Sequence, residues 1–163
     1  MKRINSTNPG NWLALVARLA AGITIFSHGA QKMLGWFGGY GFRGTLGYLT
    51  GVVHLPYAVA CGVIFVEFFA SLLLIAGVLT RVAAFALLLH FLGVLLVVHI
   101  HNGFFMNWGM EGGRGEGIEY FVLLLGLLVI NVLAGGGKAS VDALVYRKDS
   151  VTSSAPPVHT QIS

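Results

Sequence analysis

The chain has 163 residues and a formal net charge of +4; 56% of its residues are hydrophobic and only 10% are charged. Soluble domains carry roughly 25% charged residues, so this composition excludes an ordinary soluble protein and predicts an integral membrane protein of one domain. The basic residues flank the apolar segments, where they would meet lipid headgroups, which argues against a nucleic-acid partner. The single cysteine, Cys61, excludes an intramolecular disulfide.

Four apolar segments follow one another along the chain, at about 12–36, 57–79, 81–99 and 117–134. Each is near the length of roughly 20 residues that crosses the hydrocarbon core as a helix. Helix is expected because each unpaired backbone group costs several kcal/mol in lipid. The sequence therefore predicts an all-α fold, a four-helix transmembrane bundle with a short interfacial segment between the first two helices.

The links between these segments predict the rest of the organisation. The glycine-rich link 37–56 is too short for another span, and we expect a short interfacial helix within it. The membrane domain is expected over 1–148 and a disordered polar tail over 149–163. Basic residues concentrate at one end of the predicted helices, which favours a multi-pass protein of the bacterial cytoplasmic (inner) membrane with both termini cytoplasmic. The two links rich in glycine and aromatic residues would then face outward.

Ionisable side chains inside the apolar segments mark the candidate site, because each costs about 2.5–3.5 kcal/mol there and usually faces a partner or a water-filled cavity. Counted along the helices, Glu67 and His90 both fall near the midplane, and we expect them to meet across neighbouring helices. His28 and Lys32 are four residues apart and share one helix face. We expect a polar cluster in the outer half of the bundle. Its members are His28, Gln31, Lys32, Glu67, His99, His101, Asn107, Glu116 and Glu119, with Trp36, Trp108, Tyr40 and Phe105 at the rim.

These residues also have structural interpretations. Glu67 and His90 can serve as hydrogen-bonding groups between helices, Lys32 can extend its amine to the headgroups, and Trp36 fits an aromatic belt. A metal site is not predicted, because the His-Glu-x-x-His motif and a Glu-x-x-His pair are both absent from the sequence. Haem or metal binding is therefore the less favoured interpretation.

Several short motifs resemble the DoxX family of small bacterial membrane proteins, over about 15–144. The first helix, with Arg18 and then Ser-His-Gly-Ala-Gln-Lys-Met from residue 27, is similar to that family's opening signature. Val-Glu-Phe at 66–68, Gly-Val-Leu-Thr-Arg at 77–81 and Asn-Gly-Phe-Phe after His99 are similar to its second and third helices. Their order and spacing carry the resemblance, which implies four membrane helices and, for some members, a link to membrane redox systems. The related DoxD group includes a thiosulfate:quinone oxidoreductase subunit.

We therefore expect a membrane subunit of a redox system that binds quinone in the outer half of the bundle. His28, Glu67 and His99 are predicted to act on the quinone. The residues predicted to bind it are His28, Lys32, Trp36, His90 and Glu119. The chain has no evident redox centre, so we expect an electron-transferring partner protein on the outer side, besides membrane lipids and a second copy of the chain. The alternatives are a non-catalytic scaffold or assembly partner, and a small solute or proton transporter.

Overall fold

The computed structural model describes residues 7–109, 112–113 and 115–146, and all regular secondary structure in these ranges is helical. The predicted polar tail, 149–163, lies outside the described residues. The helices are α1 (Trp12–Leu34), the 3-10 turn η1 (Trp36–Gly38), α2 (Gly41–Gly51), α3 (Tyr57–Phe65), the π-helical turn η2 (Val66–Ala70), α4 (Ser71–Ala76), α5 (Thr80–Val94), the π-helical turn η3 (Leu95–His99) and α6 (Glu119–Ala134).

Three helical runs are long and apolar enough to cross a membrane: Trp12–Leu34, Tyr57–Ala76 and Thr80–His99. This agrees with the prediction of an all-α membrane protein. The helix in the fourth predicted segment, α6, is apolar but has 16 residues, which extend over about 24 Å. A fourth crossing therefore stays a prediction.

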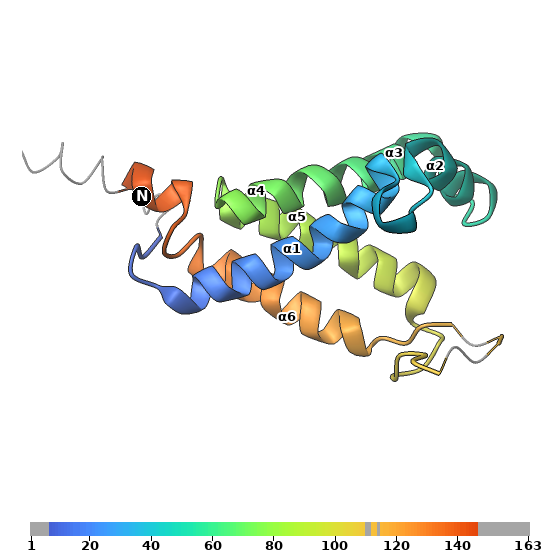
Figure 1. Cartoon of the computed structure of the whole chain (residues 1–163). Helices are drawn as coiled ribbons and strands as arrows, with labels where there is room; N and C mark the ends of the chain where they lie inside the picture. The colour runs from blue at the N-terminus through green and yellow to red at the C-terminus, as the bar shows by residue number, and fades with distance from the viewer. Residues whose placement is uncertain (1–6, 110–111, 114, 147–163) are drawn as a thin grey trace, which may run out of the picture.

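The long helices pack side by side around a shared apolar core (Figure 1). α1 contacts both α4 and α6, and α5 packs along α6. The short helix α2 lies in the glycine-rich link and packs against α1 and α3 at one end of the molecule. We call this the loop end, because the segment between α5 and α6 lies at the same end (Figure 1). The opposite end, where the segment after α6 lies, is the tail end.

A glycine determines how closely α1 approaches the second helical run. A Cβ atom on Gly29 would lie 2.9 Å from Phe68 Cα and 3.0 Å from the Glu67 carbonyl oxygen. Both atoms belong to the backbone of η2, so only glycine permits this separation. The close approach brings Lys32, one turn further along α1, next to η2.

Two long helices contain a π-helical turn, η2 in the second run and η3 at the end of the third. A π-helical turn adds one residue to an α-helix and is frequent at functional sites. Glu67 lies in η2 and His99 closes η3. The Ser71 hydroxyl donates to the Phe68 carbonyl oxygen at 2.8 Å. A side chain thus provides a hydrogen bond to a backbone carbonyl in this π-helical turn.

A buried arginine joins three segments at the tail end. Arg18 of α1 is 1% exposed, and its guanidinium donates to the carbonyl oxygens of Leu74 (3.1 Å), Ile75 (2.5 Å) and Ala139 (2.9 Å). The first two carbonyls lie at the end of α4, and the third lies after α6. Arg18 therefore satisfies carbonyls that the end of a helix leaves without intrahelical partners and ties three segments together.

Candidate functional site

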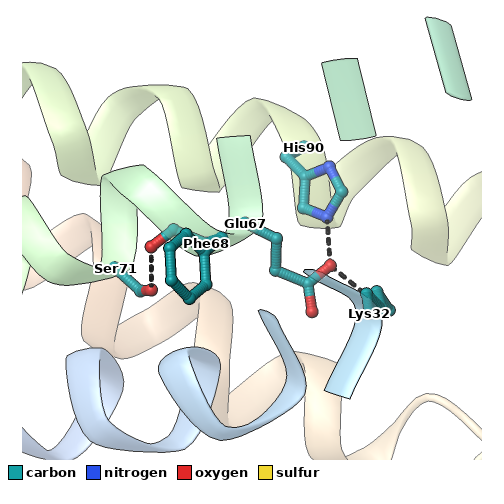
Figure 2. Close-up of polar contacts among 5 residues, drawn as sticks. All are labelled: Lys32, Glu67, Phe68, Ser71 and His90. Carbon is teal, nitrogen blue, oxygen red and sulfur yellow. Dashed lines mark hydrogen bonds and ion pairs between the residues drawn. The ribbon is translucent and has the colours of Figure 1, made fainter. Parts of the chain in front are cut away.

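Glu67 is the centre of a buried polar contact between three helical elements. Its side chain is fully buried, and one carboxylate oxygen, Oε2, accepts from Lys32 Nζ at 2.5 Å. The same oxygen lies 3.1 Å from His90 Nε2 (Figure 2). The predicted meeting of Glu67 and His90 is confirmed, and α1 supplies a second partner. A buried carboxylate needs such partners because burial of an unpaired charge is costly.

The two partners of Glu67 differ in their exposure. The side chain of Lys32 is 34% exposed and that of His90 is 6% exposed. Lys32 lies in the last turn of α1, which ends at Gly35 in the left-handed conformation. The lysine amine can therefore reach both the buried carboxylate and the surface of the loop end.

A cavity of about 260 Å³, which we call the ring pocket, lies next to Glu67 between α1, η2, α5 and α6. Aromatic rings of Phe91, Tyr120 and Phe121 contribute to its walls, together with ionisable side chains from the polar cluster. Its lining residues are His28, Lys32, Glu67, Phe91, Val94, His99, Met106, Glu116, Tyr120 and Phe121. A small pocket of this kind, mostly apolar with a few polar groups, is typical of a site for a small molecule.

Two residues that line the ring pocket each carry a buried polar atom with no hydrogen-bond partner among the described residues. The atoms are Glu67 Oε1 and the oxygen of the Tyr120 hydroxyl. Figure 2 shows Oε1 without the contacts made by Oε2. A buried polar group without a partner costs about 1–3 kcal/mol. A ligand with a hydrogen-bonding group in this pocket would remove that cost.

The two predicted histidines also line the ring pocket. The His28 ring lies 6.4 Å from the Tyr120 ring. The His99 ring lies 4.6 Å from that of Phe121, and His99 Nδ1 lies 2.8 Å from the Glu116 carbonyl oxygen. The structure therefore brings His28, Lys32, Glu67 and His99 to one pocket, as the sequence predicts.

The predicted binding residues Trp36 and Glu119 do not line the pocket. Trp36 stacks edge-on against Phe26, with ring centroids 6.5 Å apart. The Glu119 carboxylate accepts from the backbone N–H of Met106 at 3.1 Å. The Glu116 carboxylate accepts from the backbone N–H of Asn107 at 2.7 Å. These two carboxylates therefore hold the segment between α5 and α6.

The remaining members of the predicted cluster are at the surface of the loop end. The Gln31 amide donates to the Phe37 carbonyl oxygen at 3.3 Å, and His101 is exposed. Tyr40, Phe105 and Trp108 are also exposed, at 86%, 66% and 81%. Only part of the predicted cluster thus reaches the pocket.

The family model named DoxX matches residues 13–100, more than half of the chain. The chain belongs to the DoxX family. The matched part of this DoxX protein includes His28, Lys32, Glu67, His90 and His99, while α6 lies beyond it. Neither the search of curated proteins nor the search of solved structures found a match.

Sequence reasoning missed part of the pocket of this DoxX protein. Tyr120 and Phe121 carry no charge, so the cost of burial that marks the neighbouring carboxylate, Glu119, does not mark them. Their side chains lie on a different face of α6, since successive helical residues differ by about 100° in direction. Phe91 was hidden in a uniformly apolar segment. The available signal was the aromatic pair at the start of α6, a helix that packs against α1, which carries His28.

The described part of this DoxX protein contains no group of three or more His, Cys, Asp or Glu side chains arranged to hold a metal ion. The site can instead offer hydrogen bonds and protons. Its chemical groups are a carboxylate held by two basic side chains, a phenol and two imidazoles.

Proposed function

We propose that this DoxX-family protein is a membrane subunit of a redox system and binds a quinone ring in the ring pocket. The observation that carries the proposal is the pairing of aromatic walls with two unsatisfied buried polar atoms, Glu67 Oε1 and the Tyr120 hydroxyl. We further propose that the protein lies in the bacterial inner membrane with both termini cytoplasmic and the loop end outside. The distribution of basic residues supports this orientation.

The chemistry of the pocket fits a quinone. A bound quinone supplies exchange of two electrons and two protons at a flat ring with two carbonyl oxygens. The aromatic side chains Phe91 and Phe121 would flank a flat ring. The Tyr120 hydroxyl would donate to a carbonyl oxygen, and Glu67 Oε1 would hold or accept a proton at that oxygen. The volume of about 260 Å³ suits a single ring.

The other polar residues would position these groups. Lys32 and His90 both contact Glu67 Oε2, which leaves Oε1 without a partner among the described residues. The imidazoles of His28 and His99 line the same pocket and provide further proton-carrying groups. Each of these roles follows from a contact or a lining position, and each can be changed by one substitution.

We propose that electrons come from or go to another protein, because the sequence has no cysteine pair and haem or metal binding is the less favoured interpretation. We propose that this partner binds at the loop end, which is nearer the ring pocket than the tail end. Lipids surround the long apolar helices, and a second copy of the chain is a further proposed partner. Copurification from the native membrane would identify the proteins that bind.

Quinone binding tests the proposal directly. Purified protein in lipid nanodiscs is titrated with a short-chain benzoquinone, and the heat of binding is measured for wild type, Glu67→Gln and Tyr120→Phe. Each substitution is expected to weaken binding by about tenfold, which corresponds to one hydrogen bond of about 1.4 kcal/mol. Tyr57→Phe is the matched control, because Tyr57 is 67% exposed and does not line the pocket.

Two outcomes would contradict this function. One is a wild-type protein that binds no quinone at concentrations that saturate known quinone sites. The other is binding that is equally strong in the Glu67→Gln and Tyr120→Phe variants, which would place the quinone elsewhere. If the substitutions instead release a copurifying partner and leave quinone binding unchanged, the polar cluster serves assembly.

A further inference from the structure

A second cavity lies beside the ring pocket at the loop end, and we call it the α2 cavity. It has a volume of about 490 Å³ and lies between the end of α1, the glycine-rich turn after it, and α2. Among the described residues that line the two cavities, Lys32 alone lines both. One side chain thus stands between the α2 cavity and the buried carboxylate of Glu67.

The lining of the α2 cavity is mostly apolar but contains several residues that can hydrogen-bond to water. It includes the side chains of Gln31, Tyr40, Thr45 and Tyr48, all of which carry hydrogen-bonding groups. A water molecule occupies about 30 Å³ in the liquid, so the volume accommodates several. These polar groups provide hydrogen-bond partners for water in the cavity.

Thr45 gives a more specific indication. Its side chain is buried, at 7% exposed, although it lines the cavity. Thr24 and Thr50 donate back to backbone carbonyls four residues earlier, at 2.8 and 2.9 Å. The Thr45 hydroxyl makes no such bond within the described structure. It is therefore available to a molecule in the α2 cavity.

Access to Glu67 is limited once the ring pocket is filled. A proton can then reach the Glu67 carboxylate only through the two side chains that contact it in the described part of the chain, Lys32 and His90. Lys32 is 34% exposed, whereas His90 is 6% exposed. Exchange with water therefore proceeds more readily on the side of Lys32.

We propose that the α2 cavity holds water and that Lys32 passes protons between this water and Glu67. In the inward step an N–H bond of the Lys32 ammonium breaks and an O–H bond forms on the Glu67 carboxylate. The neutral amine then takes a proton from a hydronium ion that arrives through the water of the α2 cavity, and the hydronium ion becomes water. The net change is one proton moved from solution to Glu67, with no electrons transferred. The reverse sequence releases a proton. This inference rests on the proposed function because it assigns a proton route to the same pocket.

Cysteine labelling tests whether the α2 cavity contains water. Cys61 is first replaced by serine, and Thr45→Cys is compared with Leu89→Cys in membrane vesicles using a charged, water-soluble methanethiosulfonate reagent. Leu89 is 54% exposed on α5, next to His90, and faces the surroundings of the helices. Thr45→Cys should react about tenfold faster or more, because the reactive thiolate forms only in contact with water. Equal rates would overturn the proposal.

Proton exchange tests the role of Lys32. Infrared spectra are recorded after transfer to D₂O at a pH that protonates Glu67, with a benzoquinone in the ring pocket. The Glu67 carboxyl band is identified by its loss in Glu67→Gln. Lys32→Met and Thr45→Phe should slow its hydrogen exchange by about tenfold, since they remove the carrier or fill the cavity. Thr50→Phe is the matched control on the same helix.

The two experiments separate this inference from the proposed function. If wild type binds no quinone, the proposed function fails, while the labelling of Thr45→Cys still decides whether the α2 cavity contains water. If quinone binds but Lys32→Met and Thr45→Phe exchange at the wild-type rate, the proton route is wrong and the proposed function stands. Gel filtration and circular dichroism show which variants are folded before rates are compared.

Discussion

The amine of Lys32 and the carboxylate of Glu67 join α1 to η2 through a contact of 2.5 Å. The carboxylate is fully buried and the lysine is one-third exposed, so the two charges differ strongly in their access to solvent. Removal of one member of such a pair leaves the other without compensation, which costs more than the pair contributes. The effects of substitution at these two positions should therefore depend on each other.

A double-mutant cycle tests this dependence. Lys32→Met should lower the free energy of unfolding by about 1–3 kcal/mol, less than for a fully buried pair because Lys32 is partly exposed. Glu67→Gln should cost about 1–2 kcal/mol. The double variant should lose about 1 kcal/mol less than the sum of the two. The measurement is unfolding in mixed detergent micelles; additive losses would show that the two groups do not interact energetically.

The close approach of α1 to η2 predicts a steric effect at Gly29. Gly29→Ala places a Cβ atom 2.9 Å from Phe68 Cα, where rigid backbone has to move. We expect a loss of about 1–3 kcal/mol in unfolding free energy and weaker quinone binding, since α1 carries Lys32 and His28. Gly126→Ala is the control, because a Cβ there meets nothing within 4 Å. It should be neutral or stabilising by up to about 1 kcal/mol. Equal effects at both positions would exclude the steric explanation.

Removal of the Tyr120 hydroxyl should affect quinone affinity and the free energy of unfolding differently. Because this buried hydroxyl has no partner within the described structure, Tyr120→Phe should leave the unfolding free energy unchanged or raise it by about 1 kcal/mol. The same variant should bind benzoquinone more weakly. Thermal unfolding with and without benzoquinone measures both quantities in one series. A less stable variant with unchanged binding would assign the hydroxyl a structural role.

Arg18 at the tail end should not tolerate a change to lysine. Arginine presents several N–H groups in a planar fork, and here they reach carbonyls of α4 and of the segment after α6. A lysine amine cannot reach both segments in the same geometry. Arg18→Lys is expected to lower the unfolding free energy by about 2–3 kcal/mol. Arg43→Lys, at an exposed position of α2, should change it by less than about 0.5 kcal/mol.

The sequence predicts those site residues whose ionisable side chains are costly to bury in a membrane. Glu67 and His90 are isolated ionisable residues in apolar segments, and depth along a helix was enough to pair them. His28 and Lys32 were placed on one face by their spacing. The all-helical fold follows because hydrocarbon requires every backbone group to be bonded internally.

The remaining features depend on information that helical periodicity does not contain. The partner of Glu67 on α1 is selected by Gly29, whose importance appears only when the second helix is in place. The carboxylates of Glu116 and Glu119 were expected in the polar cluster, but they accept from backbone N–H groups of an irregular segment. Such contacts form where backbone groups lack partners of their own, and periodicity does not locate them.

The π-helical turns place two site residues, Glu67 and His99, at points where the helix contains an additional residue. Deletion of one residue within 66–70 would restore a regular α-helix there and leave the hydropathy profile almost unchanged. The flanking parts of the helix would keep nearly the same relative orientation, because a π-helical turn holds its extra residue within a single turn, but the side chains of the turn itself, Glu67 among them, would change direction. Homologues that keep a glutamate but lack this additional residue would therefore direct it to a different neighbour. An alignment gap of a single position in this helix distinguishes members that share the pocket from members that share only the fold.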